Sequence, residues 1–80
     1  MYNLNVTDLT IDGFDLEDAC IKNHGKKFYW QAYCINGQEY KSKKKDQNNK
    51  EKLILFNSPA DAVIAFTKRC CQQKYRRSVL

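Results

Sequence analysis

The sequence predicts an α+β domain in which an antiparallel β-sheet of three to five strands is packed by one C-terminal α-helix. Residues 28–35 are rich in aromatic side chains and precede Asn36-Gly37, which indicates a β-hairpin. Residues 57–61 carry the signals of a helix start. Because 80 residues supply only one small hydrophobic core, we expect a single domain over residues 1–80.

The domain begins with an alternating segment. In residues 2–7, apolar and polar side chains alternate, which predicts a β-strand, and Asp12-Gly13 predicts a turn after it. By composition, the domain divides into an acidic N-terminal segment (1–20), a core of hairpin, strand and helix (21–75) and a basic tail (76–80).

Residues 15–24 fit two interpretations. In the first they form a helix that is capped by Asp15 and stopped by Gly25. In the second, residues 19–22 form a strand that pairs with residues 27–30 through a four-residue turn. We prefer the strand slightly.

The clearest local feature is the hairpin formed by residues 28–35, the Asn-Gly pair and residues 38–43. Asn-Gly is typical of a two-residue type I′ turn, and that turn would place Tyr33 opposite Tyr40. Which side of the sheet is buried stays open. One candidate row contains Phe28, Trp30, Ala32 and Cys34, and the other contains Tyr29, Tyr33, Ile35 and Tyr40.

Two segments link the hairpin to the helix. The polar run over residues 41–52 has no apolar periodicity, so it predicts the end of a strand followed by an exposed loop. The apolar run over residues 53–56 predicts a short strand in the sheet.

The helix is predicted to run from Ser58 to about Tyr75. Ser58 can cap it, Pro59 suits its first position, and Asp61 lies near its positive end. The apolar face that would cover the sheet contains Ala62, Val63, Phe66, Thr67 and Cys70. We expect the tail over residues 76–80 to fray.

Cysteine usage and hydropathy bear on the compartment. There are four cysteines, no secretory signal pattern at the N-terminus and no Cys-x-x-Cys motif, so we expect apolar filler thiols in a reducing cytoplasm. No apolar run reaches the roughly 18 residues of a membrane span, so no membrane partner is expected. We expect no metal and no cofactor.

Catalysis is not expected. His24 is the only histidine, and it lies in a predicted turn, where its orientation would be loose. The three glycines stand too far apart for a phosphate-cradling loop. We therefore expect a non-enzymatic protein without catalytic residues.

The net charge of +5 is the sum of two opposed blocks. The first twenty residues carry five acids and no base, and the rest carry fourteen bases and four acids. Lysines neutralise phosphates and aromatic rings stack on bases, so an aromatic, Lys-rich hairpin favours nucleic acid. Cross-strand packing and protection of a sheet edge explain the same residues about equally well. The candidate contacts for nucleic acid or another partner are Lys22, Lys26, Lys27, Tyr29, Gln31, Lys41, Lys43, Lys44, Lys45, Arg69, Lys74, Arg76 and Arg77.

Residues 21–37 together with residues 56–62 show a turn with glycine, an aromatic strand, Asn-Gly and a capped helix. This pattern resembles the AP2-like, arm-type DNA-binding domains of phage integrases. The resemblance implies a three-stranded antiparallel sheet that packs on one helix and lies in the major groove. Carried over by position, the groove-facing residues would be Lys22, Lys26, Tyr29, Gln31, Lys41 and Lys43. In size and architecture the chain is also similar to small phage-encoded anti-CRISPR inhibitors.

Two functions remain after these observations. The first is a small basic nucleic-acid-binding module from a phage or mobile element. The alternative is a phage-encoded inhibitor, of anti-CRISPR or anti-defence type, that binds a host protein or a nucleic-acid-handling complex in the host cytoplasm. The choice between DNA, RNA and protein and the oligomeric state are not readable from the sequence.

Overall fold

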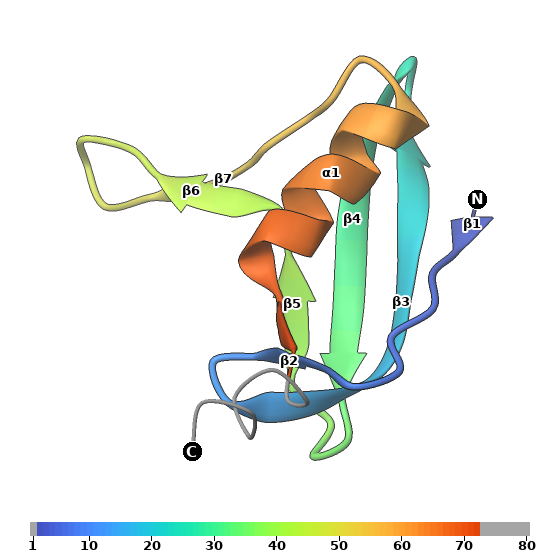
Figure 1. The fold of residues 1–80 in the computed structure, drawn as a ribbon. Helices are drawn as coiled ribbons and strands as arrows, with labels where there is room; N and C mark the ends of the chain where they lie inside the picture. The colour runs from blue at the N-terminus through green and yellow to red at the C-terminus, as the bar shows by residue number, and fades with distance from the viewer. Residues whose placement is uncertain (1, 73–80) are drawn as a thin grey trace.

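The structure is a computed structural model that describes residues 2–72. An antiparallel β-sheet carries one helix, α1 (Pro59–Arg69), across one of its faces (Figure 1), which confirms the α+β class. The strands are β1 (Tyr2–Asn3), β2 (Leu9–Ile11), β3 (Phe14–His24), β4 (Lys27–Cys34), β5 (Glu39–Lys41), β6 (Lys43–Lys45), β7 (Glu51–Leu53) and β8 (Cys71–Gln72). Across the sheet the order is β5-β4-β3-β2-β8, and β1 joins the edge of β3.

The centre of the sheet is the pair β3–β4. Residues 15–24 form a strand, so the preferred interpretation is confirmed and the helix is not formed. The turn between the strands is shorter than expected, however, because His24 pairs directly with Lys27. Gly25, with φ of +63°, accepts the left-handed conformation that so tight a turn needs. The expected four-residue turn is therefore wrong, and the register of β3 on β4 shifts by two residues, so that Lys22 pairs with Tyr29 instead of Lys27.

The strand predicted over residues 2–7 is reduced to β1. Its last sheet contact is the hydrogen bond from Leu4 N to Ala19 O, at 2.9 Å. Beyond that point the Asn5 side chain accepts a hydrogen bond from Thr7 N, and Asp8 has φ of +63°, so the chain turns away from β3. The predicted turn at Asp12-Gly13 is confirmed as the two-residue connection of β2 and β3.

The β4–β5 hairpin has a three-residue loop in place of the expected two-residue turn. Gly37 N donates to Cys34 O and Cys34 N donates to Gln38 O, each at 2.8 Å. Of the Asn-Gly pair, only Gly37 has a positive φ, so a type I′ turn is not formed. The register shifts by one residue, and Tyr40 pairs with Ala32 instead of Tyr33. This shift moves Tyr40 to the core side of the sheet.

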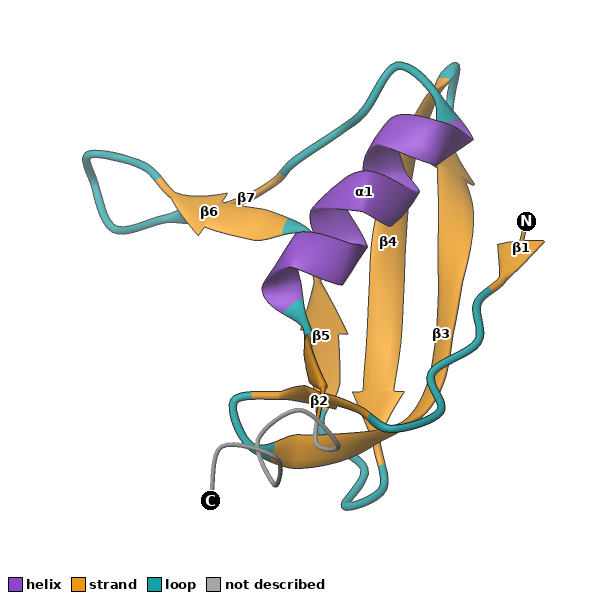
Figure 2. Cartoon of the chain, in the orientation of Figure 1, coloured by secondary structure: helices purple, strands orange, loops and turns teal. Residues whose placement is uncertain are grey.

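The polar run is a second hairpin, β6–β7, and not a loop. We call residues 43–53 the lysine finger. The Asp46 carboxylate closes its turn by accepting hydrogen bonds from Asn48 N at 2.9 Å and Lys50 N at 3.0 Å. The finger projects away from the rest of the molecule (Figure 2). The two strands pair through Lys43 with Leu53, Lys44 with Lys52 and Lys45 with Glu51, a pairing that apolar periodicity does not reveal.

The strand predicted over residues 53–56 is also not formed as such. Leu53 ends β7, and Phe56 makes a single antiparallel bridge with Phe28. Ile54 N donates to Ser42 O at 2.7 Å, so the two ends of the finger are held together where it leaves the sheet. The finger is thus inserted between two segments that both pair with the outer edge of β4: β5 precedes the finger, and Phe56 follows it.

Helix α1 begins as predicted and ends early. The Ser58 hydroxyl accepts from Asp61 N at 3.2 Å, and Pro59 occupies the first turn. The helix stops at Arg69 rather than Tyr75, because Cys71 pairs with Thr10 of β2 and the chain must be extended there. The expected fraying of residues 76–80 lies outside the described residues.

The hydrophobic core lies between α1 and the sheet. The Trp30 and Phe66 rings pack with centroids 5.4 Å apart, and Ile21, Ala32 and Cys34 are fully buried beside them. This arrangement selects the Trp30 row of β4 as the buried one. On the predicted face of the helix, Ala62 and Phe66 are buried. Val63 and Cys70, which follow the same face, are half-buried, whereas Thr67 is exposed.

Candidate nucleic-acid interface

The face of the sheet opposite α1 carries most of the candidate residues of β3, β4 and β5. Residues paired across antiparallel strands point to the same face, so Lys22 with Tyr29 and Gln31 with Lys41 lie opposite the Ile21–Trp30 pair of the core. We call this surface the open face. Its members are Asp18, Cys20, Lys22, His24, Lys27, Tyr29, Gln31, Tyr33, Glu39 and Lys41.

Charge is distributed unevenly over the open face. Lys22 and Lys27 lie near the β3–β4 turn, whereas Asp18 and Glu39 lie toward the other end of β4. Lys41 stands between these ends, 3.4 Å from the Glu39 carboxylate. One end of the face therefore attracts anions more strongly than the other.

Gln31 lies at the centre of the open face and is only 3% exposed. Its Nε2 donates to the Tyr33 hydroxyl at 2.6 Å and to Glu39 Oε2 at 2.7 Å. Its Oε1 is buried and has no hydrogen-bond partner among the described residues. An unsatisfied buried acceptor of this kind costs about 1–3 kcal/mol.

The same cluster shifts two pKa values. Hydrogen bonding to Tyr33 is the main cause that lowers the pKa of Glu39, with Lys41 and Gln31 helping. Hydrogen bonding to Glu39 in turn raises the pKa of Tyr33, and partial desolvation adds to this. At neutral pH the carboxylate is therefore ionised and the phenol is neutral, so the tyrosine ring carries no negative charge that would repel a phosphate.

Two aromatic rings of β4 lie on the open face. Tyr29 and Tyr33 are both half-buried, and four residues along a strand separate them by about 13 Å. His24 packs edge-on against Tyr29, with ring centroids 6.5 Å apart and an interplanar angle of 71°. Planar groups thus lie on both sides of Gln31.

The lysine finger is the second basic surface. Lys43 pairs with Glu51 at 3.1 Å, and Lys52 pairs with Asp46 at 3.7 Å. Within residues 2–72, no salt bridge involves the three remaining lysines of the finger, which are Lys44, Lys45 and Lys50. A shallow hollow of about 730 Å³ at the tip is lined by Lys44, Lys45, Asp46, Gln47, Asn48 and Lys52.

Arg69 is held apart from both surfaces. Its Nη2 donates to the two carboxylate oxygens of Asp12 at 3.0 and 3.1 Å, and its guanidinium lies 5.9 Å from the Tyr40 ring centroid. These contacts hold the end of α1 against the β2–β3 turn, so Arg69 stabilises the fold. The candidates Lys74, Arg76 and Arg77 lie outside the described residues.

The structure thus divides the remaining candidates between two surfaces. Lys26 is exposed in the β3–β4 turn, next to the open face. The open face holds Lys22, Lys27, Tyr29, Gln31 and Lys41, and the finger holds Lys43, Lys44 and Lys45. Tyr33 was not among the candidate contacts, although the alternation from Tyr29 through Gln31 places it on the same face.

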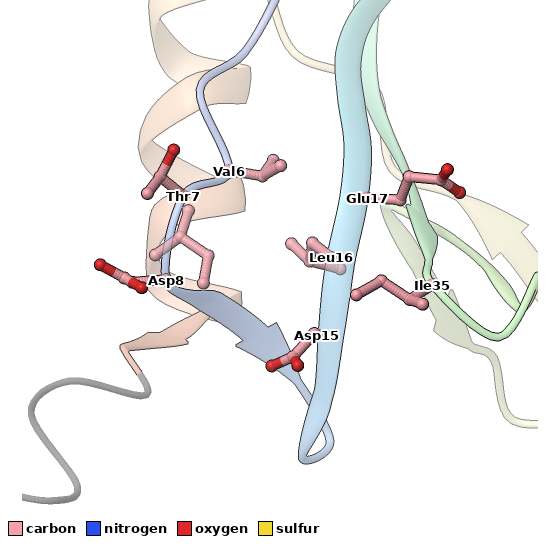
Figure 3. Close-up of a pocket in the computed structure, with 8 residues that line it drawn as sticks. Val6, Thr7, Asp8, Asp15, Leu16, Glu17 and Ile35 are labelled. Atoms are coloured by element: carbon pink, nitrogen blue, oxygen red, sulfur yellow. The ribbon is translucent and has the colours of Figure 1, made fainter.

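A groove with acidic sides lies elsewhere, beside the start of β3 (Figure 3). Its volume is about 370 Å³, and Ile35, which is 66% exposed, forms part of its wall. We call it the acidic groove; its lining residues are Val6, Thr7, Asp8, Leu9, Asp15, Leu16, Glu17 and Ile35. It lies near the end of β4 that Ile35 follows, whereas the finger leaves the sheet near the beginning of β4, where Phe56 bridges Phe28.

Comparison of the chain with protein-family models, with curated proteins and with solved structures finds no match. Within residues 2–72, no helix has the length and apolarity that crossing a membrane would require.

Proposed function

We propose that the chain is a small, non-enzymatic module that binds nucleic acid in the cytoplasm. If a phage or mobile element encodes it, this is the cytoplasm of the host. The observation that carries the proposal is the lysine finger, in which five lysines and two acids share a projecting two-stranded hairpin. A two-stranded β-ribbon fits the major groove of duplex DNA, and its lysines can contact phosphates on both sides.

The electrostatics of the finger support contact with phosphates. Lys44, Lys45 and Lys50 are exposed, and none of them forms a salt bridge with an acid of the described residues. Each lysine that neutralises a phosphate releases condensed counterions, which favours binding at low salt. On the open face, Lys22 and Lys27 extend the basic surface beyond the finger.

The test is a salt titration of binding, followed by fluorescence anisotropy of a labelled duplex. The variant Lys44→Ala/Lys45→Ala/Lys50→Ala should bind more weakly. Its plot of log affinity against log salt should be flatter by about three units, because each phosphate contact contributes about 0.9. The matched control is Lys44→Arg/Lys45→Arg/Lys50→Arg, which keeps the charge and should keep the slope. An unchanged slope in the alanine variant would show that the finger does not contact phosphates.

The acidic groove favours a second candidate function, an inhibitor that binds a nucleic-acid-handling protein of the host, of anti-CRISPR or anti-defence type. An acidic rim around the exposed Ile35 suits a partner surface that normally binds phosphates. Affinity capture from host lysate, with and without nuclease, separates the two functions. One stoichiometric protein that survives nuclease treatment supports the inhibitor, whereas nucleic acid that is lost on treatment supports the binding module.

A further inference from the structure

The open face lacks a covering element among residues 2–72, since α1 packs on the other side of the sheet (Figure 1). A sheet side with nothing on it normally carries small polar or charged residues. Here its middle strand carries Tyr29 and Tyr33 with Gln31 between them. A flat surface with planar side chains is the arrangement on which unpaired bases stack in proteins that bind single strands.

The unpartnered Oε1 of Gln31 is a second and independent observation. Both hydrogens of the amide nitrogen are used by Tyr33 and Glu39, which fixes the orientation of the side chain. The remaining oxygen is an acceptor without a donor in the described chain. Base edges carry amino and imino donors, and the imino donor of the Watson–Crick edge is exposed only when the base is unpaired.

The surrounding charges fit a sugar-phosphate backbone. Lys22 is paired with Tyr29 across the strands, and Lys41 is paired with Gln31, so cations flank the central strand on both sides. Lys27 adds a third cation near the β3–β4 turn. A strand laid along β4 would thus meet lysines beside Tyr29 and Gln31, whereas Asp18 and Glu39 lie on the two sides of Tyr33. We expect the phosphates to follow the Tyr29 end of the face, where the cations lie.

We propose that the open face is a stacking platform for single-stranded nucleic acid. On it, Tyr29 and Tyr33 stack unpaired bases, and the buried Gln31 Oε1 accepts a hydrogen bond from a base once the side chains that cover it move aside. This inference rests on the proposed function and deepens it. It assigns the open face to unpaired bases, whereas the lysine finger contacts the phosphates of both single-stranded and duplex nucleic acid.

The experiment compares a labelled single strand of about 12 nucleotides with the duplex of the same sequence, by anisotropy at low salt. The test variant is Tyr29→Leu/Tyr33→Leu, which removes both rings. Tyr29→Phe/Tyr33→Phe keeps the rings and serves as the conservative variant. Phe14→Leu removes a ring that is 44% exposed outside the open face and serves as the matched control.

We expect the double leucine variant to lose about tenfold to a hundredfold in affinity for the single strand and less than about twofold for the duplex. Phe14→Leu should bind the single strand as the original chain does. The phenylalanine variant should keep most of the affinity that the leucine variant loses, because it keeps the rings and removes only the hydroxyl groups. If circular dichroism shows that the double variant is unfolded, Tyr29→Leu alone should still lose about fivefold, because Tyr29 lies outside the Gln31–Tyr33–Glu39 cluster.

Unchanged single-strand affinity in the folded leucine variant would overturn the stacking platform and leave the proposed function intact. An equal loss for both forms would overturn it as well, because the rings would then not distinguish unpaired bases. If the original chain binds neither form, the proposed function fails together with this inference. Effects of the finger variant on both forms, without any effect of the tyrosine variants, would confine binding to the lysine finger.

Discussion

Gln31 organises the open face because one side-chain amide connects a phenol and a carboxylate from neighbouring positions of the sheet. Hydrogen bonding within this cluster lowers the pKa of Glu39 and raises that of Tyr33. Both shifts mean that the folded chain favours an ionised carboxylate beside a neutral phenol. Stability should therefore depend on pH at both ends of the range.

The acid end gives the first prediction. Because the pKa of Glu39 is lower in the folded chain than in the unfolded one, its contribution is complete above the unfolded pKa and is lost as pH falls through the folded value. Urea denaturation should show that Glu39→Gln reduces the decrease in the free energy of unfolding between about pH 5 and pH 3. An identical pH dependence in the variant and the original chain would contradict this role of Glu39.

The alkaline end has the opposite sign. The pKa of Tyr33 is raised on folding, so its contribution is present below the unfolded pKa and is lost as pH rises through the folded value. Tyr33→Phe should remove this part of the alkaline loss of stability. Urea denaturation of both chains above about pH 9 measures it, and equal slopes would argue against the hydrogen bond to Glu39.

The cysteines give a residue-scale prediction that does not depend on function. Cys20 and Cys34 are buried, burial raises the pKa of Cys34, and desolvation raises that of Cys70 to about 11. Cys71 is exposed. Iodoacetamide at about pH 8 should therefore modify Cys71 first, as mass spectrometry of peptides would show, and the other three only when the chain unfolds. Modification of Cys34 as fast as Cys71 would contradict the described core.

At the scale of elements, the β4–β5 loop and the lysine finger decide which residues share a surface. The three-residue loop sets the register that brings Glu39 next to Tyr33 and moves Tyr40 into the core. The hydrogen bond between Ile54 N and Ser42 O closes the base of the finger. Both features can be tested without reference to a ligand.

Substitution in the loop tests the register. Gly37 has φ of +90°, which other residues adopt only with strain, so Gly37→Ala should lower the free energy of unfolding by about 1 kcal/mol or more. Asn36 does not have a positive φ, so Asn36→Gly should gain nothing in stability, whereas a type I′ turn would tolerate it or benefit. Thermal denaturation measures both, and a stabilised Asn36→Gly variant would point to the two-residue turn.

Removal of the finger tests whether the finger is a separate element. Since Ser42 and Ile54 are already hydrogen-bonded, residues 43–53 can be replaced by a short Asn-Gly link. The shortened chain should keep its circular dichroism spectrum and cooperative unfolding and should lose most of its affinity for duplex DNA. Loss of the fold would contradict the description of the finger as an excursion from the sheet.

The sequence predicts elements well where one local signal acts alone. The cap at Ser58 and the turn at Asp12-Gly13 are of this kind, and both were located correctly. The end of α1 could not be predicted, because it depends on pairing between Cys71 and Thr10, which are far apart in the chain. The finger was missed because its strands bury little, so alternation of apolar and polar residues is absent.

For the open face, the aromatic strand and its candidate residues were recognisable, but their surroundings were not. The Asn-Gly pair predicted a register one residue away from the observed one, and a one-residue shift exchanges the two faces of β5. The contact of Gln31 with Tyr33 and Glu39 follows only from the observed register. Arg69 was a candidate by charge alone, and its ion pair with Asp12 depends on the tertiary fold.

At the scale of the whole molecule, the net charge of +5 conceals a separation of charge. Acids cluster around the acidic groove, whereas lysines cluster on the finger and on one end of the open face. A molecule with this separation of charge should approach a polyanion with its lysine finger pointing toward it. The association rate with nucleic acid should consequently fall steeply with ionic strength, which stopped-flow measurements can follow. A rate that does not change with salt would contradict electrostatic steering.

The central claim is that the lysine finger binds phosphates, and the salt dependence of duplex binding tests it most directly. The account predicts measurable affinity at low salt that weakens linearly on a log-log plot, with a slope that flattens by about three units in the Lys44→Ala/Lys45→Ala/Lys50→Ala variant. Absence of binding at low salt, or an alanine variant with the slope of the original chain, would contradict the claim.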